Sequence, residues 1–313
     1  FRSSTDEWAW DPSNRSIRVS RDDLHTLGPE ACAGIVAHEV GHAGVSRYLL
    51  LRSALAILMP KPELMPLFFN AIEDPRAEAH VMRKFPGVKR WLVEADSAMV
   101  PKDPKPYPRF LSFLFQAARS AHLDWALLPP NTRIAPEVLE ALRITAPARR
   151  RYAEGFLPPI DDPVACHARE VQALLEEGTE ASADPDECAA RVLSARAASH
   201  AVSRILPAFV HLWGLDVTYI ARRLSRSRSA RTLARSAVDK GVPDECLRLA
   251  THHLESPAPD RVPGPNAIHL AEDLLVTAIQ GMIATSMPST CGGPARSRRG
   301  RRRAEVRVRP TPP

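Results

Sequence analysis

Apolar residues recur at three- and four-residue intervals along most of the chain, whereas alternation of apolar and polar residues is confined to its first twenty positions. There, residues 8–10 and 16–20 flank a turn-forming cluster at 11–15, which predicts a small β element. The spacing from residue 31 onward predicts amphipathic helices. The pattern therefore indicates a mainly α fold of the α+β type, with one small N-terminal β element.

Prolines divide the helical pattern into segments, because the proline ring fixes φ and removes a backbone donor. We predict a first helix over residues 31–59, a second over 63–85 and a short third over 88–99. Loops are predicted at the proline-rich strings 101–108, 129–136, 158–163 and 257–265. Further helices are predicted near 109–127, 136–145, 164–178, 185–206, 207–224, 229–238, 243–254 and 266–286.

The order of these segments predicts three parts. Residues 1–128 hold the β element and the first helices and are expected to form the core that carries the chemistry. Residues 129–290 are expected to be a helical region that packs on this core or extends it. Residues 291–313 are rich in arginine and of low complexity, which predicts a disordered tail because such a segment cannot bury a core.

The net charge of +6 is unevenly distributed along the chain. Residues 292–313 contain eight arginines against one glutamate, so this tail carries +7 and the rest of the chain only −1. A tail of this composition predicts weak, nonspecific contact with nucleic acid. The other arginine-rich stretch, residues 222–235, lacks interleaved aromatic residues and is predicted to be a solvated surface.

Composition also bears on the compartment. No uncharged apolar stretch reaches the roughly 18 residues of a membrane helix, so we expect no membrane span. The five cysteines form neither a metal-binding spacing nor a disulfide framework. Together with the lack of a signal-peptide pattern, this favours reduced thiols and a cytoplasmic location.

The candidate chemistry lies in residues 38–42, whose sequence His-Glu-Val-Gly-His is an HExxH motif inside the first predicted helix. Residues i and i+4 of a helix share one face, so His38 and His42 can bind one Zn²⁺ at about 2.0–2.1 Å. Glu39 lies beside that face, where it can accept a proton from a zinc-bound water. We predict two metal ligands and a general base.

A third protein ligand is needed, because a catalytic zinc usually keeps three protein ligands and one open position. The longer HExxHxxGxxH pattern does not supply it. Its glycine position is occupied by Val45 and its last histidine position by Tyr48. The third ligand is therefore expected from another part of the chain.

Three carboxylates on the second predicted helix can reach the open side of the histidines. We favour Glu73, because Asn70 and Arg76 lie one turn away on either side and can hold its carboxylate by hydrogen bonds. Asp74 and Glu78 are the alternative third ligands. If Asp74 does not bind the metal, it is a further candidate to hold the ligand carboxylate.

Pro75 interrupts this segment and leaves two possibilities open. It can sit inside one continuous helix, where it removes a hydrogen bond and produces a kink. Alternatively, Asp74 is the N-cap of a new helix that begins at Pro75, which would make Asp74 compete with Glu73 for the metal.

HEVGH followed by an Asn-x-x-Glu-Asp-x-Arg-x-Glu string resembles the gluzincin branch of the zincin-like metallopeptidases. The resemblance implies that His38, His42 and Glu73 bind zinc and that Glu39 is the general base. It also implies a zincin-like core in which the N-terminal strand pair packs beside the HExxH helix and lines the substrate cleft. It is confined to residues 8–85.

The hypothesis is therefore zinc-dependent hydrolysis of peptide bonds, with a peptide or protein as the substrate. Tyr107, Tyr152, Tyr219 or a later histidine could reach the cleft as a transition-state donor, although an ordinary structural role is favoured for each. The alternative is a catalytically silent zincin-like helical protein that acts as a regulatory or nucleic-acid-associated binding module. It would bind zinc without turnover.

Overall fold

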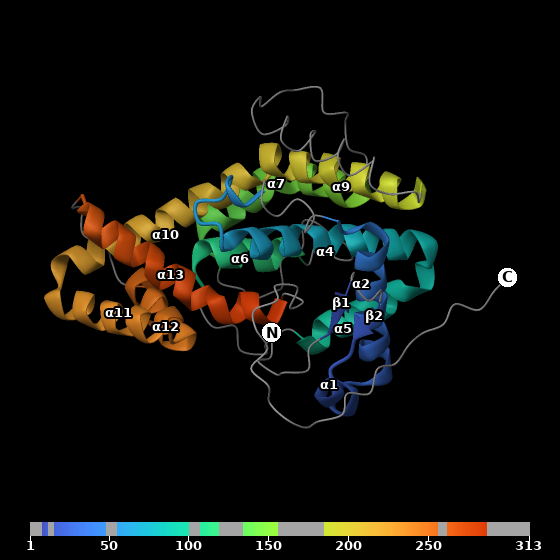
Figure 1. The fold of residues 1–313 in the computed structure, drawn as a ribbon, viewed down its shortest axis with the longest axis horizontal. Helices are drawn as coiled ribbons and strands as arrows, with labels where there is room; N and C mark the ends of the chain where they lie inside the picture. Colours follow the sequence, from blue (N-terminus) through green and yellow to red (C-terminus); the bar gives the residue numbers. More distant parts are fainter. Residues whose placement is uncertain are drawn as a thin grey trace.

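The computed structural model describes residues 8–11, 16–47, 55–99, 107–118, 134–155, 185–255 and 262–286. Within these ranges the chain is mainly α-helical, with a two-stranded sheet near the N-terminus (Figure 1). The mainly α fold predicted from the sequence is confirmed. The elements are β1 (Ala9–Asp11), β2 (Ser16–Arg18), α1 (Arg21–Thr26), α2 (Pro29–Val45), α4 (Leu64–Lys84), η2 (Pro86–Val88), α5 (Lys89–Met99), α6 (Arg109–Ala118), α7 (Pro136–Glu154), α9 (Pro185–Arg204), α10 (Leu206–Arg226), α11 (Arg228–Lys240), α12 (Pro243–Glu255) and α13 (Pro265–Ser286).

The two strands form an antiparallel hairpin, in which Trp10 pairs with Ile17. Directly after β2, the Ser20 hydroxyl accepts a hydrogen bond of 3.2 Å from the backbone N–H of Asp23 and caps α1. The indole N–H of Trp8 donates to the Asp23 carboxylate at 3.2 Å and ties the hairpin to α1. Both strands contact α2, so the hairpin lies beside the HExxH helix, as the resemblance implied.

Helix α2 ends at Val45, so the single helix predicted over residues 31–59 is wrong. The next residue, Ser46, is extended, with φ −84° and ψ 113°. The carbonyl oxygen of Val45 accepts hydrogen bonds from the side chains of Arg76 and Ser194, at 2.8 and 2.7 Å. These side chains take the place of the amide that a continuing helix would supply. Tertiary partners therefore end the helix before the apolar run that follows it.

Helix α4 runs unbroken through Pro75. The possibility that Asp74 caps a new helix at this proline is therefore contradicted. A proline inside a helix costs about 3 kcal/mol, because it removes one backbone hydrogen bond and its ring crowds the preceding turn. Packing of α4 against α2, α6, α7 and α13 stabilises the continuous helix despite this cost (Figure 1).

One hydrophobic core joins helices on both sides of the predicted division between residues 128 and 129. The rings of Phe68 in α4 and Phe209 in α10 have centroids 5.2 Å apart. The ring centroids of Phe110 in α6 and Trp213 in α10 are 5.0 Å apart. The C-terminal helices thus pack on the N-terminal ones through a shared core.

The remaining described helices follow the predicted segments with shifted ends, except α1, where no helix was predicted. Helix α7 extends beyond its predicted end, through Pro147, to Glu154. It stops at Gly155, whose φ of 76° lies in the left-handed region that glycine favours. The parts of predicted segments that lie outside the described residues are 12–15, 48–54, 101–106, 119–127, 129–133, 158–163, 164–178, 257–261 and 291–313.

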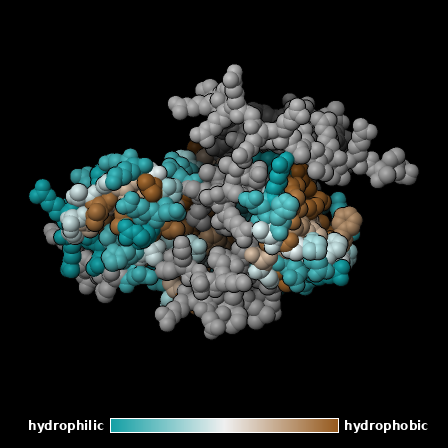
Figure 2. Space-filling model, turned by 90° about the horizontal axis from the view of Figure 1, so that it is seen from below, coloured by the Kyte–Doolittle hydropathy of each residue, from teal (hydrophilic) through white to brown (hydrophobic). Residues whose placement is uncertain are grey.

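The arginine-rich stretch 222–235 forms the end of α10 and the first part of α11. Ala234 and Ala237 turn inward and are buried, and Figure 2 shows this end of the molecule as mostly hydrophilic. The exposed arginines of the stretch are Arg226, Arg228, Arg231 and Arg235. They form a solvated surface, as predicted. Among the described helices, none is long and apolar enough to cross a membrane.

Gly41, in the middle of the HExxH motif, lies where α2 touches α4. A Cβ atom on it would meet the carbonyl oxygen of Ala77. We expect Gly41→Ala to lower the free energy of unfolding by about 1–3 kcal/mol, although alanine favours a helix, because a backbone atom cannot move aside. Urea denaturation followed by circular dichroism measures this change.

Gly214 of α10 is the matched control, because a Cβ atom there would meet no atom within 4 Å. Gly214→Ala should raise the free energy of unfolding, by up to about 1 kcal/mol, through helix propensity alone. Equal effects of the two substitutions would contradict the close approach of α2 and α4 at Gly41.

Candidate metal centre

Three side chains from α2 and α4 bring a nitrogen or oxygen atom to one point. The Nε2 atoms of His38 and His42 are 3.0 Å apart. Oδ1 of Asp74 lies 3.3 Å from Nε2 of His42 and 3.8 Å from Nε2 of His38. Ligands held tetrahedrally at about 2.0–2.1 Å from zinc are about 3.3–3.4 Å apart. The three atoms therefore have the spacing of three ligands of a tetrahedral metal site.

The close packing of α2 on α4 allows a side chain as short as aspartate to complete this group. His38 and His42 share one face of α2, one turn apart. Between them, Gly41 lets the backbone of α4 approach at Ala77. Asp74 lies one turn before Ala77, so its carboxylate reaches the two imidazoles.

Each histidine is also held through its other ring nitrogen. Nδ1 of His38 lies 3.0 Å from Oε1 of Glu78, and Nδ1 of His42 lies 2.8 Å from the hydroxyl of Ser46. An ionised carboxylate can only accept, so Nδ1 of His38 donates to it. This arrangement turns both Nε2 atoms toward Asp74 and is the usual way in which metal-binding histidines are oriented.

Oδ1 of Asp74 is buried and has no hydrogen-bond partner among the described residues. A buried polar atom without a partner is costly, and buried polar groups are normally hydrogen-bonded or bind metal. A cation bound between this carboxylate and the two imidazoles would give Oδ1 of Asp74 the partner that it lacks among the described residues.

The electrostatic field of the site favours positive charge. Burial alone lowers the pKa of His38. The hydrogen bond with Glu78 and the charges of Asp74, Glu78 and Glu39 outweigh burial and raise that pKa from 6.5 to about 10. Three carboxylates thus surround the histidine pair, and a bound cation would meet the same attraction as the proton.

Glu39 lies next to this group but is not one of its three converging atoms. Its carboxylate is buried, and Oε2 accepts a hydrogen bond of 2.6 Å from the backbone N–H of Trp10 in β1. Its charge acts on the imidazole of His38. The hairpin therefore fixes the orientation of Glu39, whose part as a general base stays a prediction.

Glu73, which we favoured as the third ligand, does not lie with the histidines. Its buried carboxylate accepts hydrogen bonds of 3.1 and 3.2 Å from Nη1 of Arg76 and one of 2.5 Å from the hydroxyl of Tyr152. Successive residues on a helix point about 100° apart, so turning Asp74 toward α2 turns Glu73 toward α7. Asp74, the alternative ligand, occupies the place expected for Glu73.

The other predicted residues of this helix lie around the two acids. Arg76 holds the carboxylate of Glu73, as expected, but on the side away from the histidines. Glu78, the second alternative ligand, is not one of the three converging residues. Its carboxylate contacts Nδ1 of His38 and so holds that imidazole in place. Asn70 is half-buried, one turn before Glu73.

The sequence did not point to Ser46 and Ser194, and for Tyr152 it favoured an ordinary structural role without indicating the contact with Glu73. Ser46 stands four residues after His42, a helical spacing that could have indicated it. Tyr152 and Ser194 had no such signal, because 79 residues separate Tyr152 from Glu73 and 149 separate Ser194 from Val45. Tyr152 lies behind α4 and contacts Glu73.

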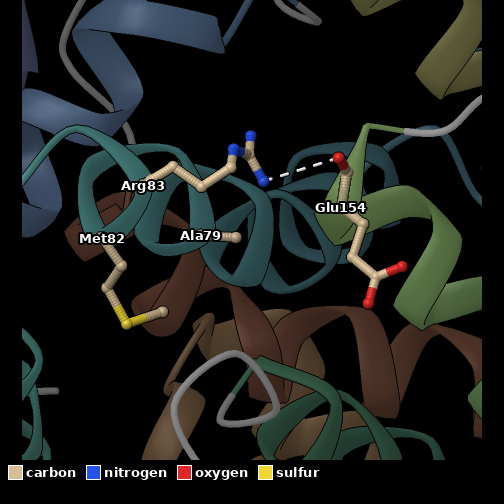
Figure 3. Close-up of a pocket in the computed structure, with 4 residues that line it drawn as sticks. All are labelled: Ala79, Met82, Arg83 and Glu154. Atoms are coloured by element: carbon tan, nitrogen blue, oxygen red, sulfur yellow. Dashed lines mark hydrogen bonds between the residues drawn. The ribbon is translucent and has the colours of Figure 1, made fainter. Parts of the chain in front are cut away.

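A separate open pocket lies between the last turns of α4 and α7 (Figure 3). Its lining residues are Ala79, Met82, Arg83 and Glu154, and none of them belongs to the metal centre. The guanidinium of Arg83 donates to the main-chain oxygen of Glu154 at 3.5 Å, while the Glu154 carboxylate points away. This pocket is therefore distinct from the converging ligand atoms.

Comparison of the chain with protein-family models, curated proteins and solved structures gives no match. The resemblance to the gluzincins therefore stays a prediction from the two motifs. Only the geometry of the centre bears on its chemistry.

Proposed function

We propose that the protein is a zinc-dependent hydrolase of peptide bonds, in which His38, His42 and Asp74 hold the metal and Glu39 is the general base. One observation carries the proposal: two imidazole nitrogens and a carboxylate oxygen converge at 3.0–3.8 Å beside the glutamate of an HExxH sequence. The proposed substrate is a peptide or a protein. The cytoplasmic location stays a prediction.

The residues present fit zinc in three respects. Two imidazoles and one carboxylate are the nitrogen and oxygen donors that catalytic zinc accepts. Both imidazoles are anchored through Nδ1, which directs Nε2 toward the metal position. Oδ1 of Asp74 is buried there without a hydrogen-bond partner in the described ranges.

Bound zinc would supply Lewis acidity, which polarises a peptide carbonyl and lowers the pKa of water to about 7. Glu39 would accept the proton of the attacking water and later deliver it to the leaving amine. The Trp10 N–H already occupies Oε2 of this carboxylate, which leaves Oε1 for the proton. Glu78 and Ser46 keep the histidine rings in place through this cycle.

The direct test is zinc content together with hydrolysis. We expect the purified protein to hold about one zinc per chain and to cleave unstructured peptides, as detected by mass spectrometry. A chelator should abolish cleavage, and added zinc should restore it. A chain without zinc, or cleavage that resists chelation, would overturn the proposal. Zinc without turnover would instead support the alternative of a catalytically silent zincin-like regulatory or nucleic-acid-associated module.

A further inference from the structure

Behind the metal centre, a buried network of polar side chains joins four helices. Nη1 of Arg76 donates to both carboxylate oxygens of Glu73, and Nη2 donates to the carbonyl oxygen of Val45 at 2.8 Å. The same carbonyl accepts from Ser194 of α9, and Tyr152 of α7 donates to Glu73. All four residues are at most 4% exposed. Helices α7 and α9 lie side by side beyond α4 (Figure 1). Helix α9 therefore contacts the end of α2 directly, whereas α7 is linked to it through Glu73 and Arg76 of α4.

The peptide unit between Val45 and Ser46 connects this network to a metal ligand. Its oxygen accepts from Arg76 and Ser194, while its N–H donates to the carbonyl oxygen of His42 at 2.9 Å. The Ser46 hydroxyl then lies 2.8 Å from Nδ1 of His42. Because the peptide is planar, fixing its oxygen fixes the position from which Ser46 reaches the imidazole.

Arg76 also shares a helix turn with Asp74. The two residues are about 200° apart around α4, so they act on opposite sides of the same turn. Asp74 faces the histidines, and Arg76 donates a hydrogen bond to the Val45 carbonyl at the end of the helix that carries them. The guanidinium therefore sets how the last turn of α2 lies against the turn of α4 that supplies the third ligand.

Stability alone is a weak reason for such a network. A buried ion pair is often no more stabilising than well-packed apolar residues, because both charges lose their hydration. A planar guanidinium, by contrast, offers several donors in a rigid fork and can hold a carboxylate and a carbonyl in fixed directions. That property suits a residue that fixes the positions of other groups.

We propose that Arg76, held in place by Glu73 and Tyr152, is a positioning residue for the metal centre. Through Val45 and Ser46 it orients His42, so that α7 and α9 belong to the metal centre although they supply no ligand. The inference rests on the proposed zinc site.

The test compares zinc affinity and metal geometry in two variants of the full chain. Arg76→Lys keeps the charge but loses the fork, and Tyr152→Phe removes a single hydroxyl. Zinc affinity is measured by competition with a chromophoric chelator, and ligand geometry by the visible spectrum of the Co²⁺-loaded protein. We expect each variant to bind zinc about 10–100-fold more weakly and to show an altered Co²⁺ spectrum.

The matched control is Arg109→Lys, because Arg109 of α6 makes a similar bond, of 2.9 Å, to the fully buried Asp216 of α10. It should lower the melting temperature and leave zinc affinity and the Co²⁺ spectrum unchanged. Tyr152→Phe keeps the test valid should Arg76→Lys fail to fold.

Two results would overturn the inference while leaving the zinc proposal intact. One is wild-type zinc affinity and Co²⁺ spectrum in both Arg76→Lys and Tyr152→Phe. The other is an equal loss of zinc affinity in the Arg109→Lys control, which would show general destabilisation. A wild-type chain that binds no zinc would instead refute the proposed function, and the inference with it.

Discussion

Glu39→Gln is expected to lower the rate of peptide hydrolysis by about 10²–10⁴-fold while zinc remains bound. Glutamine has nearly the same size, and its amide oxygen can still accept the hydrogen bond that the Trp10 N–H gives to Oε2 of Glu39. It cannot take a proton from water at neutral pH. The fold and the ligand group should therefore persist, and only the proton transfer should be lost.

Steady-state kinetics on one cleaved peptide, with zinc content measured on the same samples, checks this result. Glu30→Gln is the matched control, because Glu30 is an exposed glutamate in the first turn of the same helix. It should leave kcat unchanged. Hydrolysis by Glu39→Gln at the wild-type rate would remove this residue from the mechanism.

Asp74→Asn should weaken zinc binding by more than the roughly 10–100-fold that is typical for a residue supporting a ligand, because it removes the ligand's charge. In the absence of metal, the same substitution should lower the stability of the fold less than Glu73→Gln does. It breaks no hydrogen bond to Oδ1 of Asp74 among the described residues, and it removes only one of the three carboxylate charges that raise the pKa of His38.

Glu73→Gln is the comparison that separates the two neighbouring acids. It should still bind zinc stoichiometrically, with a smaller loss of affinity, because Glu73 acts on the site only through Arg76. Its main effect should be lower stability, since it breaks a buried ion pair. The opposite outcome, with zinc lost in Glu73→Gln and kept in Asp74→Asn, would restore Glu73 as the ligand.

The histidine pair could be predicted because its geometry is local. The four-residue spacing of His38 and His42 places both imidazoles on one helix face, whatever surrounds that helix. Helix α4 was predicted for a similar reason, since its apolar spacing and flanking prolines are sequence features. The HExxH helix and the carboxylate-bearing helix are thus properties of the sequence.

The choice between Glu73 and Asp74 could not be predicted in the same way. Adjacent helical residues differ by about 100° in direction, so the answer depends on the rotation of α4 about its axis. Contacts with α2 on one side and α7 on the other set that rotation. The hydrogen bond from Tyr152, 79 residues away, accounts for the direction of Glu73.

The sequence by itself determined a mainly helical chain, the paired histidines and the neighbouring glutamate, because each depends on spacing within one segment. Only the tertiary structure decided where α2 ends, which carboxylate faces the histidines and what lies behind them. Those features depend on partners brought together by packing, such as Ser194, which lies 149 residues from the Val45 carbonyl it contacts. No local pattern encodes a contact at that separation.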